Sequence, residues 1–507
     1  MKNILEQFEL IEQLFADKII YSDVEKAVTF SEFKTRCKQV ASEIAKHRLF
    51  NQPIAVVDSR NVNTLIAMFG VVYSGNHYVV LDGTSPVERL VKICNVVEPK
   101  LILCEQQTVA ITQELIGSLS VSTKPKTVDM EIQTDINEQQ LADIREKAVA
   151  TDPAYILFTS GSTGTPKGTV ITHANILAYM EWFVKTFEIG ENTTFASQTP
   201  FYFSASVSDT YSALLAGATL NIIPKSYFSF PIQLVRFLNE RKVNTIYWVP
   251  SALCLCANIK LLDYEKPQYL ERVMFAGEIM PCKQLNYWRK HLPDVQYANL
   301  FGPTEVVDIC TYYKVNREFK DDDSLPVGKH CECVTTFVVG EDGKEITECG
   351  KIGELYVKGP SVANGYYKNE EATNKAFVQN PLNQFYPEKV YRTGDLVQIN
   401  EYGEYEFVGR ADFQIKHKGY RIELGEIERV AGALEKIDSA VALFDKDEDA
   451  IILVYTGRKK SDEVVTELKN KLPDYMIPEK VIKTSQLPIT PNGKIDRKQL
   501  LNIYKTL

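Results

Sequence analysis

The 507-residue chain has no apolar stretch long enough to cross a membrane, which takes roughly 18 or more apolar residues in a row. Its amphipathic N-terminus, MKNILEQFELIEQLFADK, also lacks the uninterrupted apolar core of a secretion signal. We therefore expect a cytoplasmic protein without a membrane partner.

Excess positive charge is also missing. The formal net charge is -9 and the isoelectric point is about 5.5, so nucleic acid is not expected as a partner. The ten cysteines are scattered, and the two Cys-x-Cys pairs lack the spacing and histidines of a zinc site. We expect reduced structural thiols.

Apolar runs alternate with segments of helical periodicity, as in Ile54–Val57, Thr64–Tyr73 and Tyr78–Leu81. This pattern predicts an α/β fold whose parallel strands are joined by helices. From about Pro326 the runs become shorter and turns separate them. We expect a large N-terminal domain of parallel-type sheets with helices over residues 1–409, including a small β-rich part at about 326–409. A small mobile α+β domain should follow over residues 410–507.

The segment TSGSTGTPKG, Thr159–Gly168, is rich in glycine and hydroxyl side chains and follows a predicted strand. Glycines allow close approach of the backbone to an anion, and hydroxyls and a lysine add donors. It is not a P-loop, because Lys167 follows a proline and precedes a glycine. Taken alone, the segment is compatible with either a phosphate-binding loop or a surface loop of small residues.

Further motifs follow in order: NLFGPTE from Asn299, YRTGDL from Tyr391, GRADFQIKHKGYRIELGEIE from Gly409, LPDYMIP from Leu472 and NGKIDRKQL from Asn492. Together with VTFSEF and HYVVLDGTSPVERL upstream, they resemble the adenylate-forming enzymes over nearly the whole chain. The chain is most similar to amino-acid adenylation domains of nonribosomal peptide synthetases and to stand-alone D-alanine–carrier protein ligases.

The resemblance implies a two-step reaction that uses ATP and Mg2+. A carboxylate attacks the α-phosphate, pyrophosphate leaves, and a thiol then takes the acyl group from the adenylate. Such a reaction requires alignment and charge neutralisation. By resemblance, Thr304 contacts the α-phosphate, Glu305 ligates Mg2+, and Lys494 stabilises the transition state as the catalytic lysine. The implied ATP-binding residues are Thr159, Ser160, Gly161, Ser162, Thr163, Gly164, Thr165, Lys167, Asn299, Phe301, Gly302, Asp395 and Arg410.

The family also rotates its C-terminal domain between the two half-reactions. The resemblance places the hinge at Asp412. The family often has arginine before the following glycine, where this chain has Lys418, a change that keeps the charge.

The acyl pocket departs from the family pattern. In amino-acid adenylation domains, an aspartate pairs with the α-ammonium group of the substrate, and here its position is Ser204. The wall positions implied by motif matching are Ser204, Ala205, Ser208, Tyr247, Met274, Ala276, Leu300, Asp308 and Ile309.

Two interpretations of this pocket stay open. An amine could pair with Asp308, which suits a β-amino, ω-amino or diamino acid; we favour this one, because an apolar wall should not retain an unpaired carboxylate. Otherwise the acid lacks an α-amine, as aryl, hydroxy and keto acids do. Asp308 could also face away and cap local backbone, and Asp209 could replace it if the register slips.

Seven residues follow Leu500, so we expect the acceptor thiol to belong to a separate carrier protein with a phosphopantetheine arm. An aryl- or acyl-CoA ligase is one alternative. A catalytically silent protein that binds ATP or an acid is another.

Overall fold

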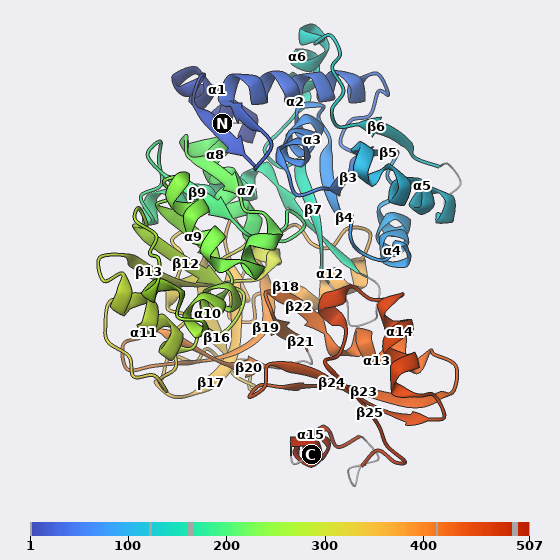
Figure 1. Ribbon diagram of the computed structural model, residues 1–507, viewed down its shortest axis with the longest axis vertical. Coiled ribbons are helices and arrows are strands. Elements are labelled where there is room, and N and C mark those ends of the chain that lie inside the picture. The colour runs from blue at the N-terminus through green and yellow to red at the C-terminus, as the bar shows by residue number, and fades with distance from the viewer. Residues whose placement is uncertain (1–2, 121–123, 160–165, 412–413, 489–494, 506–507) are drawn as a thin grey trace.

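The computed structural model describes residues 3–120, 124–159, 166–411, 414–488 and 495–505. Figure 1 shows two strand-and-helix layers in the N-terminal part, a β-rich part below them, and the C-terminal elements at one side of the base.

The first sheet has six strands in the order β6-β5-β3-β4-β7-β8, and all neighbours are parallel except β7 and β8. Its helices follow the strands as crossovers, and α3 packs on β3 and β4. The strands are β3 (Pro53–Asp58), β4 (His77–Asp82), β5 (Leu101–Cys104), β6 (Lys126–Asp129), β7 (Pro153–Thr159) and β8 (Lys167–Thr172). The helices of this region are α2 (Phe30–Ala45), α3 (Val62–Tyr73), α4 (Val87–Val97), α5 (Val109–Ser118) and α6 (Glu138–Lys147).

The second sheet has nine strands in the order β15-β14-β13-β12-β11-β9-β10-β1-β2. Its central strands are parallel, and β2, β14 and β15 add antiparallel edges. The strands are β1 (Ile19–Ser22), β2 (Ala27–Thr29), β9 (Thr194–Ser197), β10 (Thr219–Ile222), β11 (Thr245–Trp248), β12 (Arg272–Ala276), β13 (Gln296–Phe301), β14 (Thr311–Lys314) and β15 (Lys329–His330). The helices are α1 (Ile4–Phe15), α7 (His173–Thr186), α8 (Ala205–Ala216), α9 (Pro231–Glu240), α10 (Pro250–Asn258) and α11 (Cys282–His291).

An antiparallel sheet forms the β-rich part, in the order β16-β17-β19-β18, and β20 also pairs with β19. Its strands are β16 (Thr335–Val339), β17 (Ile352–Lys358), β18 (Phe377–Gln379), β19 (Lys389–Ile399) and β20 (Tyr405–Arg410), with the helix α12 (Glu370–Ala376). The pairing of β19 with β20 places Asp395 opposite Arg410.

The C-terminal elements begin with a hairpin of β21 (Gln414–His417) and β22 (Tyr420–Glu423), which we call the closing hairpin. A three-stranded sheet of β23 (Ile437–Asp445), β24 (Ala450–Gly457) and β25 (Lys480–Lys483) follows. Side chains of α13 (Leu424–Gly432) and α14 (Ser461–Lys469) form one apolar cluster with this sheet, and those of α15 (Arg497–Lys505) form a second. Figure 1 shows α15 at the outer end of the molecule.

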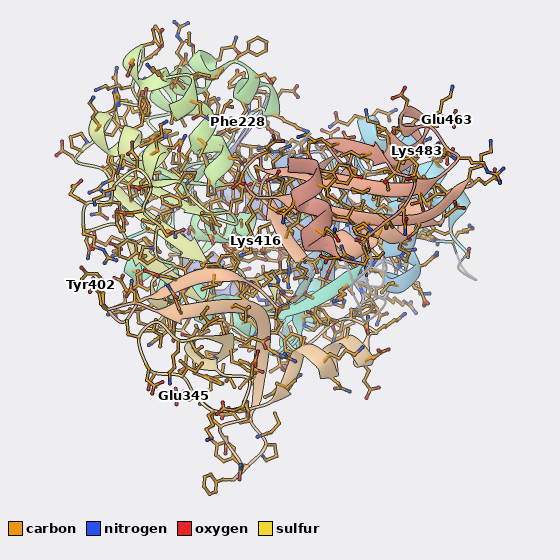
Figure 2. All side chains as sticks on the ribbon, turned by 90° about the horizontal axis from the view of Figure 1, so that it is seen from below. Phe228, Glu345, Tyr402, Lys416, Glu463 and Lys483 are labelled. Carbon is orange, nitrogen blue, oxygen red and sulfur yellow. The ribbon has the colours of Figure 1, made fainter. Side chains whose placement is uncertain are left out.

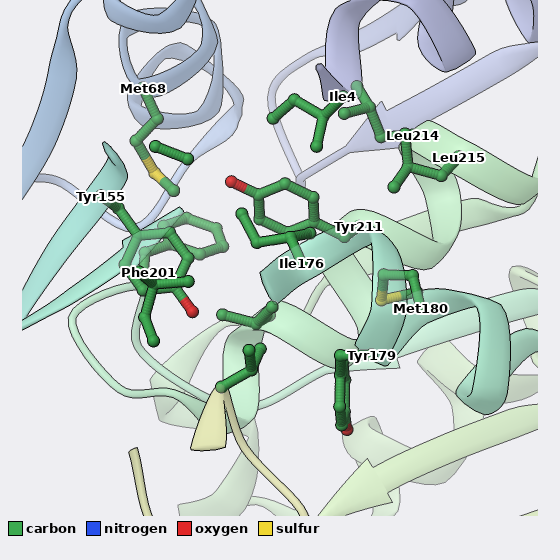
Figure 3. Packing of buried hydrophobic residues seen from close by; sticks show 14 of the residues in the cluster. Ile4, Met68, Tyr155, Ile176, Tyr179, Met180, Phe201, Tyr211, Leu214 and Leu215 are labelled. Carbon is green, nitrogen blue, oxygen red and sulfur yellow. The ribbon is translucent and has the colours of Figure 1, made fainter. Parts of the chain in front are cut away.

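One apolar core joins the two large sheets. It contains buried side chains from both sheets and from α2, α3, α7 and α8. Figure 3 shows part of it, with the hydroxyl of Tyr179 directed away from the apolar side chains of Ile176 and Met180. The helix α7 is fixed at its start by a reciprocal cap between Thr172 and Asn175. Tyr179 is therefore held on a capped helix, with its buried hydroxyl directed away from these apolar side chains and bonded to Ser208.

The predicted α/β fold is confirmed, including the strands at Ile54–Val57 and Tyr78–Leu81 and the helix over Thr64–Tyr73. The predicted domain boundary coincides with the end of β20, and Asp412 lies outside the described residues. The division of the chain at residue 410 stays a prediction. None of the helices within the described ranges is long and apolar enough to cross a bilayer.

Candidate active site

The two ends of the predicted phosphate loop lie next to each other. Thr159 ends β7, Lys167 begins β8, and the two are cross-strand partners. The ammonium of Lys167 lies 5.6 Å from the ring centre of Tyr366. Several predicted residues fall outside the described residues: Ser160, Gly161, Ser162, Thr163, Gly164, Thr165, the hinge Asp412 and the catalytic Lys494.

The predicted adenine and ribose contacts come from β13, β19 and β20. The Nδ2 atom of Asn299 donates to the carbonyl of Pro326 at 2.8 Å. Asp395 is buried, and its Oδ1 accepts from Nη1 of Arg410 at 2.7 Å. The ammonium of Lys416 lies 4.1 Å from the ring centre of Phe301. Burial lowers the pKa of this lysine, although the negative charge of Asp395 acts in the opposite direction. Figure 2 shows Lys416 near the middle of the molecule, at the base of the C-terminal elements.

Beyond β13, the chain turns tightly at Gly302. A Cβ atom there would lie 2.3 Å from the carbonyl oxygen of Asp308 and 2.5 Å from Cα of Ile309. These approaches are too close for any side chain. Glycine thus allows the segment Gly302–Thr304 to pack directly on the backbone of Asp308.

Glu305 is almost fully buried, with 1% exposure, in the 3-10 turn Thr304–Val306. Its Oε1 accepts from the hydroxyl of Tyr366 at 2.6 Å, and its Oε2 pairs with Nη1 of Arg421 at 2.7 Å. Burial opposes ionisation of this carboxyl group, but the charge of Arg421 and the Tyr366 hydroxyl outweigh burial and lower its pKa. Glu305 is held as a carboxylate.

Asp308 is also buried, but its hydrogen-bond donors are neutral hydroxyls. Its Oδ2 accepts from Ser208 at 2.7 Å, from Tyr247 at 3.0 Å and from Tyr179 at 3.4 Å. Burial raises the pKa of Asp308 to about 6, and the hydroxyls, including that of Ser204, limit the increase. Among the described residues, no lysine, arginine or histidine forms an ion pair with it.

A cavity of about 130 Å³ lies beside Asp308, whereas Glu305 is buried outside its lining. Of the predicted wall residues, Ser204, Ala205, Ala276, Asp308 and Ile309 line it. Ser208, Tyr247, Met274 and Leu300 are buried but do not line it, and Asp209 is likewise buried outside the lining. The contacts of Asp308 run to side-chain hydroxyls buried behind the cavity wall, and it is Asp308, not Asp209, that lines the cavity. Of the predicted nucleotide-binding and catalytic residues, Thr159, Gly302, Thr304, Asp395 and Arg410 also line the cavity, together with Lys416.

The closing hairpin covers this cavity from the C-terminal side. Gly419 has φ of +82°, and a Cβ atom there would lie 2.7 Å from Cγ1 of Val249. Tyr420 stacks on Tyr475 with ring centres 3.9 Å apart and meets Phe203 edge-on. The C-terminal elements therefore contribute walls to the same cavity as the N-terminal sheets.

Comparison with known proteins shows the family of this chain. Residues 9–367 match the family described as AMP-binding enzyme. The chain belongs to this family. It is an adenylate-forming ligase, and its family uses ATP.

Individual relatives differ in length. The chain is 31% identical to a D-alanine–D-alanyl carrier protein ligase of Listeria monocytogenes serovar 1/2a, over 98% of both chains. It is 30% identical to tyrocidine synthase 1 of Brevibacillus parabrevis over 98% of its own length, but it spans only 45% of that protein. The adenylation domain AlmE of Vibrio cholerae, solved with glycyl-adenosine-5'-phosphate, superposes with a TM-score of 0.85 at 21% identity, covering 99% of this chain and 98% of that one.

Within this AMP-binding enzyme, sequence reasoning missed four side chains: Tyr179, Tyr366, Lys416 and Arg421. Tyr179 is 129 positions from Asp308, and Arg421 is 116 positions from Glu305. Only Lys416 and Arg421 carried a signal, because both stand in the motif FQIKHKGYRIELGEIE. The two tyrosines lie in no motif that pointed to the site.

Proposed function

We propose that the chain uses ATP to convert an acid, whose amine is not on the α carbon, into its acyl-adenylate with release of pyrophosphate. The acyl group then passes to the phosphopantetheine thiol of a separate carrier protein. The observation that carries the choice of acid is Asp308, a buried carboxylate that lines the cavity and has only hydroxyl partners among the described residues. A buried charge is costly unless it is paired, so an ammonium group of the substrate is the partner that fits it.

In the first half-reaction, a carboxylate oxygen of the substrate bonds to the α-phosphorus as the bond to the pyrophosphate oxygen breaks. Thr304 lies at the cavity wall where the α-phosphate would be held. Lys167 and the predicted loop would bind the β- and γ-phosphates, and Lys494 would stabilise the charge of the transition state. Asp395, Arg410 and Asn299 would hold the nucleoside.

The carboxylate of Glu305 is a suitable ligand type for Mg2+. Glu305 follows the cavity-lining Thr304 in the chain and has a lowered pKa, and Mg2+ is commonly bound by one or two carboxylates together with phosphates and water. Bound there, the ion would neutralise phosphate charge. Arg421 already pairs with Oε2, so Glu305 would have to share or exchange this partner.

In the second half-reaction, the thiol sulfur bonds to the acyl carbon and AMP leaves. The similarity to a carrier protein ligase over 98% of both chains supports a carrier as the acceptor. The closing hairpin, which lines the cavity through Lys418, Gly419 and Tyr420, would form part of the thiol entrance.

The test is ATP–pyrophosphate exchange over α-amino, β-amino, ω-amino, diamino, aryl and hydroxy acids, with Lys494→Ala as the inactive control. We expect exchange with an acid whose amine is not on the α carbon. Exchange only with amine-free acids contradicts the proposal, and exchange with no acid favours a silent binding protein. Thioester formation is then followed by intact mass of a phosphopantetheinylated carrier and, in parallel, with CoA. Faster transfer to CoA than to any carrier would favour the CoA ligase alternative.

A further inference from the structure

The position of Asp308 relative to Thr304 indicates where the amine lies on the substrate. The hydroxyl of Thr304 donates to that of Ser204 at 3.2 Å, and the Ser204 hydroxyl stabilises ionised Asp308. These three side chains therefore form a short polar series along one wall of the cavity. Close packing of Gly302 on the backbone of Asp308 keeps the series short.

The far side of Asp308 is closed. Its donors Tyr179, Tyr247 and Ser208 come from α7, β11 and α8, and all three are at most 2% exposed. They converge on Oδ2, so the carboxylate is anchored at this depth. A longer acid would have to extend past a wall of tightly packed aromatic rings.

We expect an α-amine to fall short of this carboxylate. With the substrate carboxyl group beside Thr304, an amine on the adjoining carbon lies at the level of Ser204, which offers a hydroxyl and no charge. One additional carbon moves the amine one step along the series, to Asp308. A second amine finds no further free counter-charge, because the other carboxylate in the described lining, Asp395, is paired with Arg410.

We infer that the substrate is a short β-amino acid whose β-ammonium pairs with Asp308, with the carboxyl group held at Thr304. The inference rests on the proposed function and selects among the acids that it allows. An α-amine would lie beside Ser204, and the wall behind Asp308 is closed. These two features together limit the length of the substrate's carbon chain.

The experiment compares pyrophosphate exchange for a homologous series: alanine, β-alanine, 3-aminobutyrate, 4-aminobutyrate and 2,3-diaminopropionate, with propionate as the amine-free member. We expect kcat/KM for β-alanine or 3-aminobutyrate to exceed that for alanine and for 4-aminobutyrate by at least about 100-fold. A preference for 4-aminobutyrate, 2,3-diaminopropionate or alanine overturns the inference. The first two leave the proposed function in place, and alanine or propionate as the best substrate contradicts both.

A pair of variants tests the same geometry from the protein side. The double change Ser204→Asp with Asp308→Asn moves the carboxylate one step toward Thr304 and should shift the preference from β-alanine to alanine. Asp308→Asn alone is the matched control: it should lower exchange with β-alanine without raising exchange with alanine. If the double variant does not fold, as judged by circular dichroism, the wild-type series alone decides, because each of its outcomes supports or overturns the assignment.

Discussion

Glu305 and Asp308 are two buried carboxylates on one short segment, and their surroundings are opposite. Glu305 has a guanidinium and a hydroxyl as partners, and its pKa is lowered. Asp308 has hydroxyls alone, and burial raises its pKa to about 6. The protein provides the cation for one carboxylate and leaves the other to be paired by a ligand. This difference is the physical basis for assigning the amine of the substrate to Asp308.

The largest effect is expected from Asp308→Asn. The amide keeps the shape of the side chain but cannot neutralise an ammonium group, so kcat/KM for the preferred amino acid should fall by about 100- to 1,000-fold. Steady-state pyrophosphate exchange measures this change. Asp209→Asn is the control, because Asp209 is buried outside the cavity lining and should leave KM nearly unchanged. Equal losses in both variants would mean that Asp308 acts through folding alone.

Gly302→Ala tests whether the spacing between Thr304 and Asp308 matters. The added Cβ would lie 2.3 Å from the carbonyl oxygen of Asp308, so the backbone must move and displace Asp308 from Thr304. We expect a folded protein with exchange reduced by roughly 100-fold, since small displacements in a reacting geometry are costly. Retention of full exchange would show that this packing does not set the site.

Arg421→Gln removes the cationic partner of Glu305. Arg421 lies on the closing hairpin, so its pairing with Glu305 holds the hairpin against the N-terminal sheets in the orientation seen here. Its removal leaves Glu305 unpaired and loosens the contact between the hairpin and the N-terminal sheets. Thiol transfer, which uses the hairpin, should therefore fall by about tenfold, and pyrophosphate exchange should change much less. Arg421→Lys is the control that keeps the charge. A larger loss in exchange than in transfer would contradict this role.

The smallest effect concerns the pH dependence of stability, to which the two carboxylates contribute in opposite directions. The raised pKa of Asp308 contributes stability that is complete below the unfolded pKa and is lost as pH rises through about 6. Glu305, whose pKa is lowered, contributes stability that is present at neutral pH and is lost as pH falls through its folded pKa. Without ligand, Asp308→Asn should therefore stabilise the protein at pH 7 by about 1–2 kcal/mol and have little effect at pH 4. Glu305→Gln should destabilise it at pH 7, and urea unfolding curves at both pH values check the pair.

Much of the fold was predictable from the sequence, because buried strands such as β3 and β4 are continuous apolar runs bounded by polar turns. The motif order identified the segments around Asn299, Thr304 and Asp395, of which Thr304 and Asp395 line the cavity. The hydroxyls around Asp308 were harder to predict, because Tyr179 reaches it from a helix whose other face belongs to the apolar core. The pairing of Arg421 with Glu305 depends on how the closing hairpin packs against the N-terminal sheets, and nothing local in the sequence specifies that packing.

The most direct test of the account is a crystal structure with 5'-O-[N-(β-alanyl)sulfamoyl]adenosine, a stable analogue of the β-alanyl adenylate. We expect the β-ammonium within about 3 Å of a carboxylate oxygen of Asp308, with the acyl carbonyl beside Thr304. An ammonium group paired with another side chain, with Asp308 still bonded only to hydroxyls, would contradict the assignment of Asp308 as the amine partner.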